Sequence, residues 1–229
     1  MRQLHDTIPR GDIIIKYGEA LNITCNLNMS MVAQYGENVS SRLYFTRNNE
    51  ELPSEMIDVL NSTSIRLYLK DHPKGKQLNY YCWIRDEPTH KTALSTRHSG
   101  NKVVCFNVVF VGVAPQNITD FSCLSRNYEN LTCSWTAKTN YVDTDYNLTY
   151  YLRVRASRNN KRHKRPDTNE SKQTETRLSC YWDLYTDPQY RQSHGVFYFR
   201  LRMNNTFGTN ENNFTFEHFK HVLPNPPRI

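Results

Sequence analysis

The chain of 229 residues contains no long apolar run, so no segment is predicted to cross a membrane and no signal-peptide core is present. We expect any leader or membrane anchor to lie outside these residues. Helical periodicity is scarce. The chain also lacks Gly-x-Ser-x-Gly, His-Glu-x-x-His and phosphate-loop patterns, and its eight histidines are scattered. We therefore expect no catalytic residues, no cofactor and no metal, and the chain is predicted not to be an enzyme.

Acceptor sequences for N-glycosylation, Asn-x-Ser/Thr, are more frequent than chance predicts even in a chain rich in Asn and Thr. They begin at Asn22, Asn28, Asn38, Asn61, Asn117, Asn130, Asn147, Asn169, Asn204 and Asn213. This density is typical of a secreted or cell-surface protein. The six cysteines fit the same oxidising compartment. An extracellular location is predicted.

The charge is strongly basic, with a formal net charge of +7 and an isoelectric point of about 9.1. An extracellular location argues against nucleic acid as the partner. Much of the charge falls in one polar stretch, "NNKRHKRP", whose basic residues are Lys161, Arg162, Lys164 and Arg165. Two interpretations stay open: a solvated loop, or a site for a heparan-type anionic polysaccharide.

Short β-like runs separated by polar turns recur along the whole chain, six before residue 112 and five after it. This spacing predicts an all-β protein of two tandem β-sandwiches, an immunoglobulin-like domain over 1–112 and a fibronectin type III-like domain over 113–223. The Gly and Pro of "VGVAPQ" mark the boundary. Residues 224–229 are proline-rich and are predicted to form a stiff hinge towards a further domain.

Two cysteines suggest a cross-sheet disulfide in the first half. Cys82 follows Tyr80 by two residues, the tyrosine-corner spacing of strand F in immunoglobulin sandwiches. Cys25, on an early strand, is its natural partner. The core Trp of strand C is missing, and either Phe45 or Tyr44 must take its place.

A second disulfide is predicted near the middle of the chain, between Cys123 and Cys133. The two cysteines fit adjacent antiparallel strands, and Trp135 faces the same side of its strand as Cys133. Fibronectin-type sandwiches usually lack disulfides, so this clip is informative. A generic staple of a small loop is the alternative.

The segment "CLSRNYENLTCSW" resembles the first disulfide and Cys-x-Trp of the cytokine-binding module in class I (haematopoietic) cytokine receptors. Other stretches agree: "VDTDYNLTYYLRV" resembles strand C, "FYFRLRMNNTFGTNE" strand F, and "LPNPPRI" the proline hinge. "LYFTRNNEELPSEMIDVLNSTSIRLYLKD" followed by "LNYYCWI" is similar to the N-terminal immunoglobulin-like domain of the interleukin-6-type shared signalling receptor. The resemblance therefore covers nearly the whole chain.

The chain departs from the family at three points. The second family disulfide would pair Cys180 with a cysteine about ten residues earlier, where Glu170 stands. Cys105 has no obvious partner either, so these two cysteines are expected to be unpaired or to pair unexpectedly. The Trp-Ser-x-Trp-Ser signature is absent because it belongs to the half of the module that follows the hinge.

The resemblance implies that a four-helix-bundle cytokine binds at the hinge end of the second domain. It also implies that the first domain contacts a different cytokine molecule or subunit, and that receptor chains associate and signal through JAK/STAT. Tyr and Arg are the residue types enriched at binding hot spots. The candidate contacts on the end loops are Tyr128, Tyr185, Tyr190, Arg191, Gln192 and His194. Packing of Tyr185 under its loop is the alternative.

Two other functions stay open at this point. Immunoglobulin and fibronectin domains also build cell-adhesion and guidance receptors, and the chain could belong to a soluble decoy or glycan-binding protein. In the receptor interpretation the chain is part of the ectodomain of a single-pass plasma-membrane protein, which acts as a homodimer or heteromer.

Overall fold

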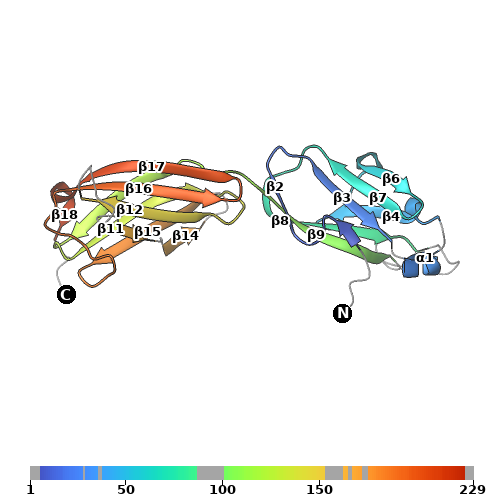
Figure 1. Ribbon diagram of the computed structural model, residues 1–229, viewed down its shortest axis with the longest axis horizontal. Coiled ribbons are helices and arrows are strands. Elements are labelled where there is room, and N and C mark those ends of the chain that lie inside the picture. The colour runs from blue at the N-terminus through green and yellow to red at the C-terminus, as the bar shows by residue number, and fades with distance from the viewer. Residues whose placement is uncertain are drawn as a thin grey trace. The chain divides into compact units, whose positions relative to one another are not determined.

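The computed structural model describes residues 6–27, 29–35, 38–86, 101–152, 162–164, 167–171 and 175–224. The chain forms two compact units, Met1–Gly112 and Val113–Ile229. Each unit consists of two β-sheets (Figure 1). This confirms the predicted all-β class of immunoglobulin-like and fibronectin-like sandwiches. Among the described helices, none is long and apolar enough to cross a membrane.

The first unit pairs a four-stranded sheet with a five-stranded one. The four-stranded sheet contains, in order across it, β1 (Asp6–Ile8), β3 (Leu21–Asn26), β7 (Ser64–Leu69) and β6 (Ile57–Asn61). The five-stranded sheet contains β2 (Ile13–Lys16), β9 (Lys102–Gly112), β8 (Gly75–Ile84), β4 (Leu43–Arg47) and β5 (Glu50–Glu51). The described short helices are α1 (Met29–Tyr35), η1 (Ser40–Arg42) and η2 (Ser54–Met56).

The core of the first unit lies between these two sheets. Alternate residues of β3 are buried there, and the Cys25–Cys82 disulfide joins β3 to β8, as predicted. Phe45 belongs to this core and takes the place of the missing Trp, whereas Tyr44, although buried, lies outside the core cluster. Strand alternation decides between them, because neighbouring side chains face opposite sides of a sheet.

The second unit also has two sheets. The first contains β14 (Asp167–Ser171), β15 (Glu175–Asp183), β11 (Asn130–Lys138), β10 (Thr119–Arg126) and β18 (Val222–Leu223). The second contains β13 (Arg162–Lys164), β12 (Asp145–Tyr151), β16 (Val196–Asn205) and β17 (Gly208–Glu217). A short helix, η4 (His218–His221), lies between β17 and β18.

An aromatic core fills the second unit. Trp135 and Trp182 are fully buried, and the ring of Phe121 stacks on that of Phe214 at 4.0 Å between centroids. The predicted disulfide between Cys123 and Cys133 is present and joins register partners on β10 and β11. It therefore ties two adjacent antiparallel strands, and Trp135 packs in the same core as Cys133.

The remaining two cysteines take no part in these disulfides. Cys105 packs against the core of the first unit and Cys180 is buried in the core of the second. Cys180 lies opposite Cys133 across the β11–β15 pair.

Candidate functional site

One end of the second unit is built from the turn between β10 and β11, the connection from β15 to β16, η4 and β18. At the turn, Asn127 and Tyr128 both have left-handed backbone conformations, with φ of 46° and 55°. Asn tolerates this region, whereas a Tyr rarely adopts it. The turn is held on both sides: Glu129 donates its N–H to the carbonyl of Arg126 at 2.8 Å, and Asn127 donates to the carbonyl of Leu223 at 3.0 Å. A strained residue fixed in this way is a reason to look for function at Tyr128.

Three apolar side chains lie exposed around this turn, and we call Tyr128, Phe219 and Leu223 the end patch. They are 45%, 55% and 47% exposed. The Tyr128 and Phe219 rings meet edge to face at 6.3 Å, and the pairing of β18 with β10 places Leu223 opposite Arg126. Exposed aromatic side chains held in one orientation are typical of binding surfaces.

A buried polar network supports the end patch from below. The hydroxyl of Tyr190 contacts the Ser125 hydroxyl at 2.7 Å and also the His218 Nε2. The other ring nitrogen of His218, Nδ1, lies 2.7 Å from the carbonyl oxygen of His194 and donates to it. Burial lowers the pKa of His218, so its ring is neutral at physiological pH, which leaves Nε2 to accept from Tyr190. Burial also raises the pKa of Tyr190.

The connection between β15 and β16 is anchored at several points. The carboxylate of Asp183 accepts the backbone N–H groups of Tyr185 and Thr186 at 2.8 and 2.7 Å, which is an Asx-type turn. The Tyr150 hydroxyl donates to the carbonyl of Gln189 at 2.7 Å. The connection is therefore fixed to the core, whereas the side chain of Tyr185 is 93% exposed to solvent.

The structure separates the candidate contacts that the sequence groups together. Arg191 and Gln192 are exposed, and His194 is half-buried and uses its carbonyl to hold His218. Tyr190 is only 2% exposed, so the expectation that it presents a surface to a ligand is corrected: its side chain belongs to the core. The exposure of Tyr185 likewise contradicts the alternative in which it packs under the loop.

Sequence reasoning missed Phe219 and Leu223. Phe219 lies in η4, outside every motif of the sequence, and Leu223 was considered only as the first residue of the hinge segment "LPNPPRI". The available signal was two large apolar side chains in a short polar segment, but only the placement of η4 and β18 beside the β10–β11 turn gives them a role.

The basic stretch is not simply a loop. Residues 162–164 form β13, which pairs antiparallel with β12. This corrects the expectation of an unbroken loop through Arg162 and Lys164. Lys161, Arg165 and the proposed hinge beyond residue 224 lie outside the described residues.

The described acceptor asparagines of the first unit lie on or beside its four-stranded sheet. In the described part of the first unit, Asn22 lies on β3 and Asn61 on β6, both strands of the four-stranded sheet. Asn38 precedes Val39, whose N–H bonds to Ser62 beside that sheet. Among the residues that the structure describes, no acceptor sequence begins on a strand of the five-stranded sheet.

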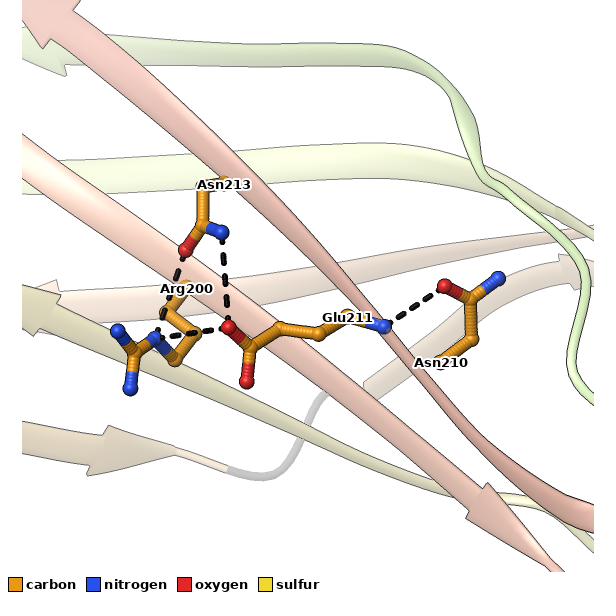
Figure 2. Close-up of polar contacts among 4 residues, drawn as sticks. All are labelled: Arg200, Asn210, Glu211 and Asn213. Carbon is orange, nitrogen blue, oxygen red and sulfur yellow. Dashed lines mark hydrogen bonds and ion pairs between the residues drawn. The ribbon is translucent and has the colours of Figure 1, made fainter.

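In the second unit Asn213 is exposed on β17 and lies beside Arg200 and Glu211 (Figure 2). Its amide contacts both Glu211 Oε1 at 3.5 Å and Arg200 Nε at 3.5 Å, beside an ion pair of 3.1 Å between Arg200 and Glu211. A glycan at Asn213 would therefore sit beside an ordered polar cluster.

The five-stranded sheet of the first unit has an aromatic outer face. Its rings follow one another from β9 to β4: Phe106 to Tyr81 at 5.9 Å, Tyr81 to Trp83 at 6.0 Å, and Trp83 to Tyr44 at 6.5 Å. The guanidinium of Arg85 lies 4.3 Å from the centre of the Tyr44 ring. Phe106 is 59% exposed. We call these rings the sheet face. The solvated side of an antiparallel sheet is normally polar, so a row of aromatic rings on this side is unusual.

Comparison with known proteins points to one class. No protein-family model matches the chain. A Drosophila melanogaster protein named cytokine receptor is 26% identical over 220 residues, which is 92% of this chain and 15% of that protein. Cytokine receptor-like factor 1 of mouse and of human are each 28% identical over 148 residues, 62% of this chain and 31% of theirs. These similarities support a cytokine-receptor-like family for the chain.

The chain spans less than a third of the length of these relatives.

Among solved structures, titin domains A168–A170 align over 93% of this chain and 62% of the titin chain, with 10% identity and a TM-score of 0.42.

Proposed function

We propose that the chain is the ligand-binding region of a class I cytokine receptor of the interleukin-6 shared signalling type, and that it binds a four-helix-bundle cytokine through the end patch. Among such receptors, the insect receptor Domeless is the one we expect it to correspond to. The chain lies outside the cell, in the ectodomain of a single-pass membrane protein. Cytokine binding brings receptor chains together, as homodimer or heteromer, and JAK/STAT signalling follows through regions outside these residues. The function is binding and not catalysis.

The end patch carries this proposal. Its aromatic rings are exposed and yet fixed, because the strained turn and the buried Tyr190–His218 network hold them. A surface that is already ordered loses little entropy when it binds, so more of the contact energy appears as affinity. Tyr185 and Arg191, exposed on the neighbouring connection, are the next contacts we expect.

Surface plasmon resonance with the helical cytokines of the source organism tests this site. Phe219→Ala removes a central ring, and we expect its Kd to rise at least tenfold, as for a hot-spot residue. Tyr128→Ala is expected to weaken binding similarly. Tyr68→Ala is the matched control. Tyr68 lies on β7, in the four-stranded sheet of the first unit, and its side chain is 46% exposed, as much as that of Tyr128. Unchanged affinity in both end-patch variants would refute the assignment.

We propose that the sheet face makes the second contact of the receptor complex, with a further cytokine molecule or receptor subunit. Two observations support this: Phe106 is exposed while Tyr81 and Trp83 are half-buried, and the described acceptor residues Asn22 and Asn61 lie on strands of the four-stranded sheet. Phe106→Ser should abolish assembly of the full complex in sedimentation experiments while leaving binding at the end patch intact. Tyr68→Ser should change neither. Assembly that survives Phe106→Ser would contradict this second contact.

The two alternative functions, an adhesion or guidance receptor and a decoy or glycan-binding protein, predict different observations. An adhesion or guidance receptor rarely carries a clip such as Cys123–Cys133, and the presence of this disulfide favours the cytokine receptor. A decoy or glycan-binding protein would depend on the basic stretch. Neutralising Lys161, Arg162, Lys164 and Arg165 should then abolish retention on heparin, whereas we expect the end-patch affinity to persist.

A further inference from the structure

Three cysteines of the first unit converge in its core, one from each of three strands. Cys25 comes from β3, Cys82 from β8 and Cys105 from β9, and their sulfurs all lie within 4.8 Å of one another. Cys25 and Cys82 form the disulfide. The Sγ of Cys105 is 3.1 Å from the Sγ of Cys25, about 1 Å further than a disulfide bond.

A β-bulge brings Cys105 into this position. The register of β8 and β9 passes from Cys82 opposite Cys105 to Trp83 opposite Val103, which leaves Val104 as an extra residue. Along a regular strand, neighbouring side chains point to opposite faces of the sheet, and a bulge interrupts this alternation. Val104, 1% exposed, and Cys105 consequently both pack against the core.

We propose that Cys105 is an alternative partner of Cys25, and that a Cys25–Cys105 disulfide replaces Cys25–Cys82 by exchange within the first unit. The Cys105 thiol loses its proton, and the thiolate attacks Cys25 Sγ. The bond between Cys25 and Cys82 breaks, and Cys82 leaves as a thiolate that takes up a proton. One disulfide is exchanged for another, so no oxidant or reductant is consumed.

The exchanged bridge still joins the same two sheets, because β8 and β9 are neighbours in the five-stranded sheet. The sequence separations are 57 residues for Cys25–Cys82 and 80 for Cys25–Cys105. Loop-closure entropy changes slowly with length, so it scarcely distinguishes the two. Before the exchange, the disulfide joins β3 to β8, the strand that carries Tyr81 and Trp83. After the exchange, it joins β3 to β9, the strand that carries Phe106.

Burial sets the rate of this exchange. It raises the pKa of Cys105 to about 12, so at pH 7 only about one thiol in 10⁵ is ionised. Exchange in the folded unit is therefore slow at neutral pH and should accelerate about 100-fold between pH 7 and pH 9. It should also accelerate wherever the unit opens and the thiol is solvated.

The Cys82→Ser variant of the full chain tests which partner Cys25 takes. The secreted protein is unfolded in denaturant at mildly acidic pH, where disulfide exchange is slow, its free thiols are blocked with a maleimide, and it is digested without reduction and mapped by mass spectrometry. We expect a peptide pair linked through Cys25 and Cys105, and no alkylated Cys25. The control, Cys82→Ser with Cys105→Ser, should instead yield alkylated Cys25. A folded Cys82→Ser chain in which both cysteines are alkylated would overturn the proposal.

The wild-type chain provides a second test that does not depend on the folding of any variant. It is incubated without oxidant at pH 7 and pH 9, and at the midpoint of unfolding, and then mapped in the same way. We expect the Cys25–Cys105 pair together with alkylated Cys82, and a faster appearance at the higher pH. If only Cys25–Cys82 is found under every condition, or if Cys82–Cys105 forms instead, the inference is wrong.

Discussion

Replacement of Tyr190 by Phe is the sharpest test of how the end patch is supported. The ring stays in the core, but the hydroxyl that joins Ser125 to His218 is lost. Both partners are buried, with 0% exposure, so each is left without this bond. A buried polar group that loses its partner costs about 1–3 kcal/mol. We expect the second unit to lose about 2–3 kcal/mol of its free energy of unfolding, or about 8–12 °C in Tm.

Tryptophan fluorescence during denaturant unfolding measures this loss. Trp135 and Trp182 report on the second unit, and Trp83→Phe removes the only other tryptophan of the chain. The second unit can then be followed separately, which matters because a chain with two units need not unfold in one step.

The control is Tyr185→Phe, which removes the same hydroxyl from a side chain that is 93% exposed and should change stability by less than about 0.5 kcal/mol. A double-mutant cycle of Tyr190→Phe with Ser125→Ala should give a coupling energy of about 1 kcal/mol. If Tyr190→Phe is as stable as the wild type, the network does not support the patch and the reasoning fails.

Three further predictions follow from the same unit. Because burial lowers the pKa of His218 from its usual 6.5, the unfolded chain binds a proton more readily than the folded one. The free energy of unfolding should therefore fall as the pH drops below about 6.5 towards the lowered value, and His218→Gln should flatten this dependence in urea titrations. Replacing Cys123 and Cys133 by Ser should lower the free energy of unfolding by about 3 kcal/mol, because the disulfide closes a loop with a sequence separation of 10. Denaturant unfolding measures this loss, and an unchanged free energy of unfolding would refute the prediction. In Gly195→Ala the new Cβ would lie 3.1 Å from Phe219 Cε2, so the ring must shift. Cytokine affinity should fall several-fold while Tm changes by less than about 4 °C; unaltered affinity would contradict the patch.

Local patterns in the sequence predict much of this protein because they depend on near neighbours. Strand alternation and turn residues give the all-β class, and Cys123, Cys133 and Trp135 lie close enough in sequence for their shared core face to follow from the strand period. The Cys25–Cys82 disulfide was predictable over a longer distance because Tyr80 marks the strand on which Cys82 lies.

The candidate site was less predictable because exposure depends on contacts that are distant in sequence. Tyr185 and Tyr190 lie in one polar loop and look alike, yet one is exposed and the other is buried beneath η4. Nothing local distinguishes them. Phe219 gains its place in the end patch because Tyr128, far away in the chain, packs edge to face against it.

The sequence by itself therefore determined the β-sandwich class and the two disulfides, since strand periodicity, the spacing of Cys123 and Cys133, and the Tyr80–Cys82 spacing that marks a strand are all local patterns. The tertiary structure alone decided which aromatic side chains reach solvent and which cysteine lies beside Cys25. Both depend on how strands from distant parts of the chain pair: the parallel contact of β18 with β10 completes the end patch, and a single extra residue at Val104 accompanies the turn of Cys105 towards the core.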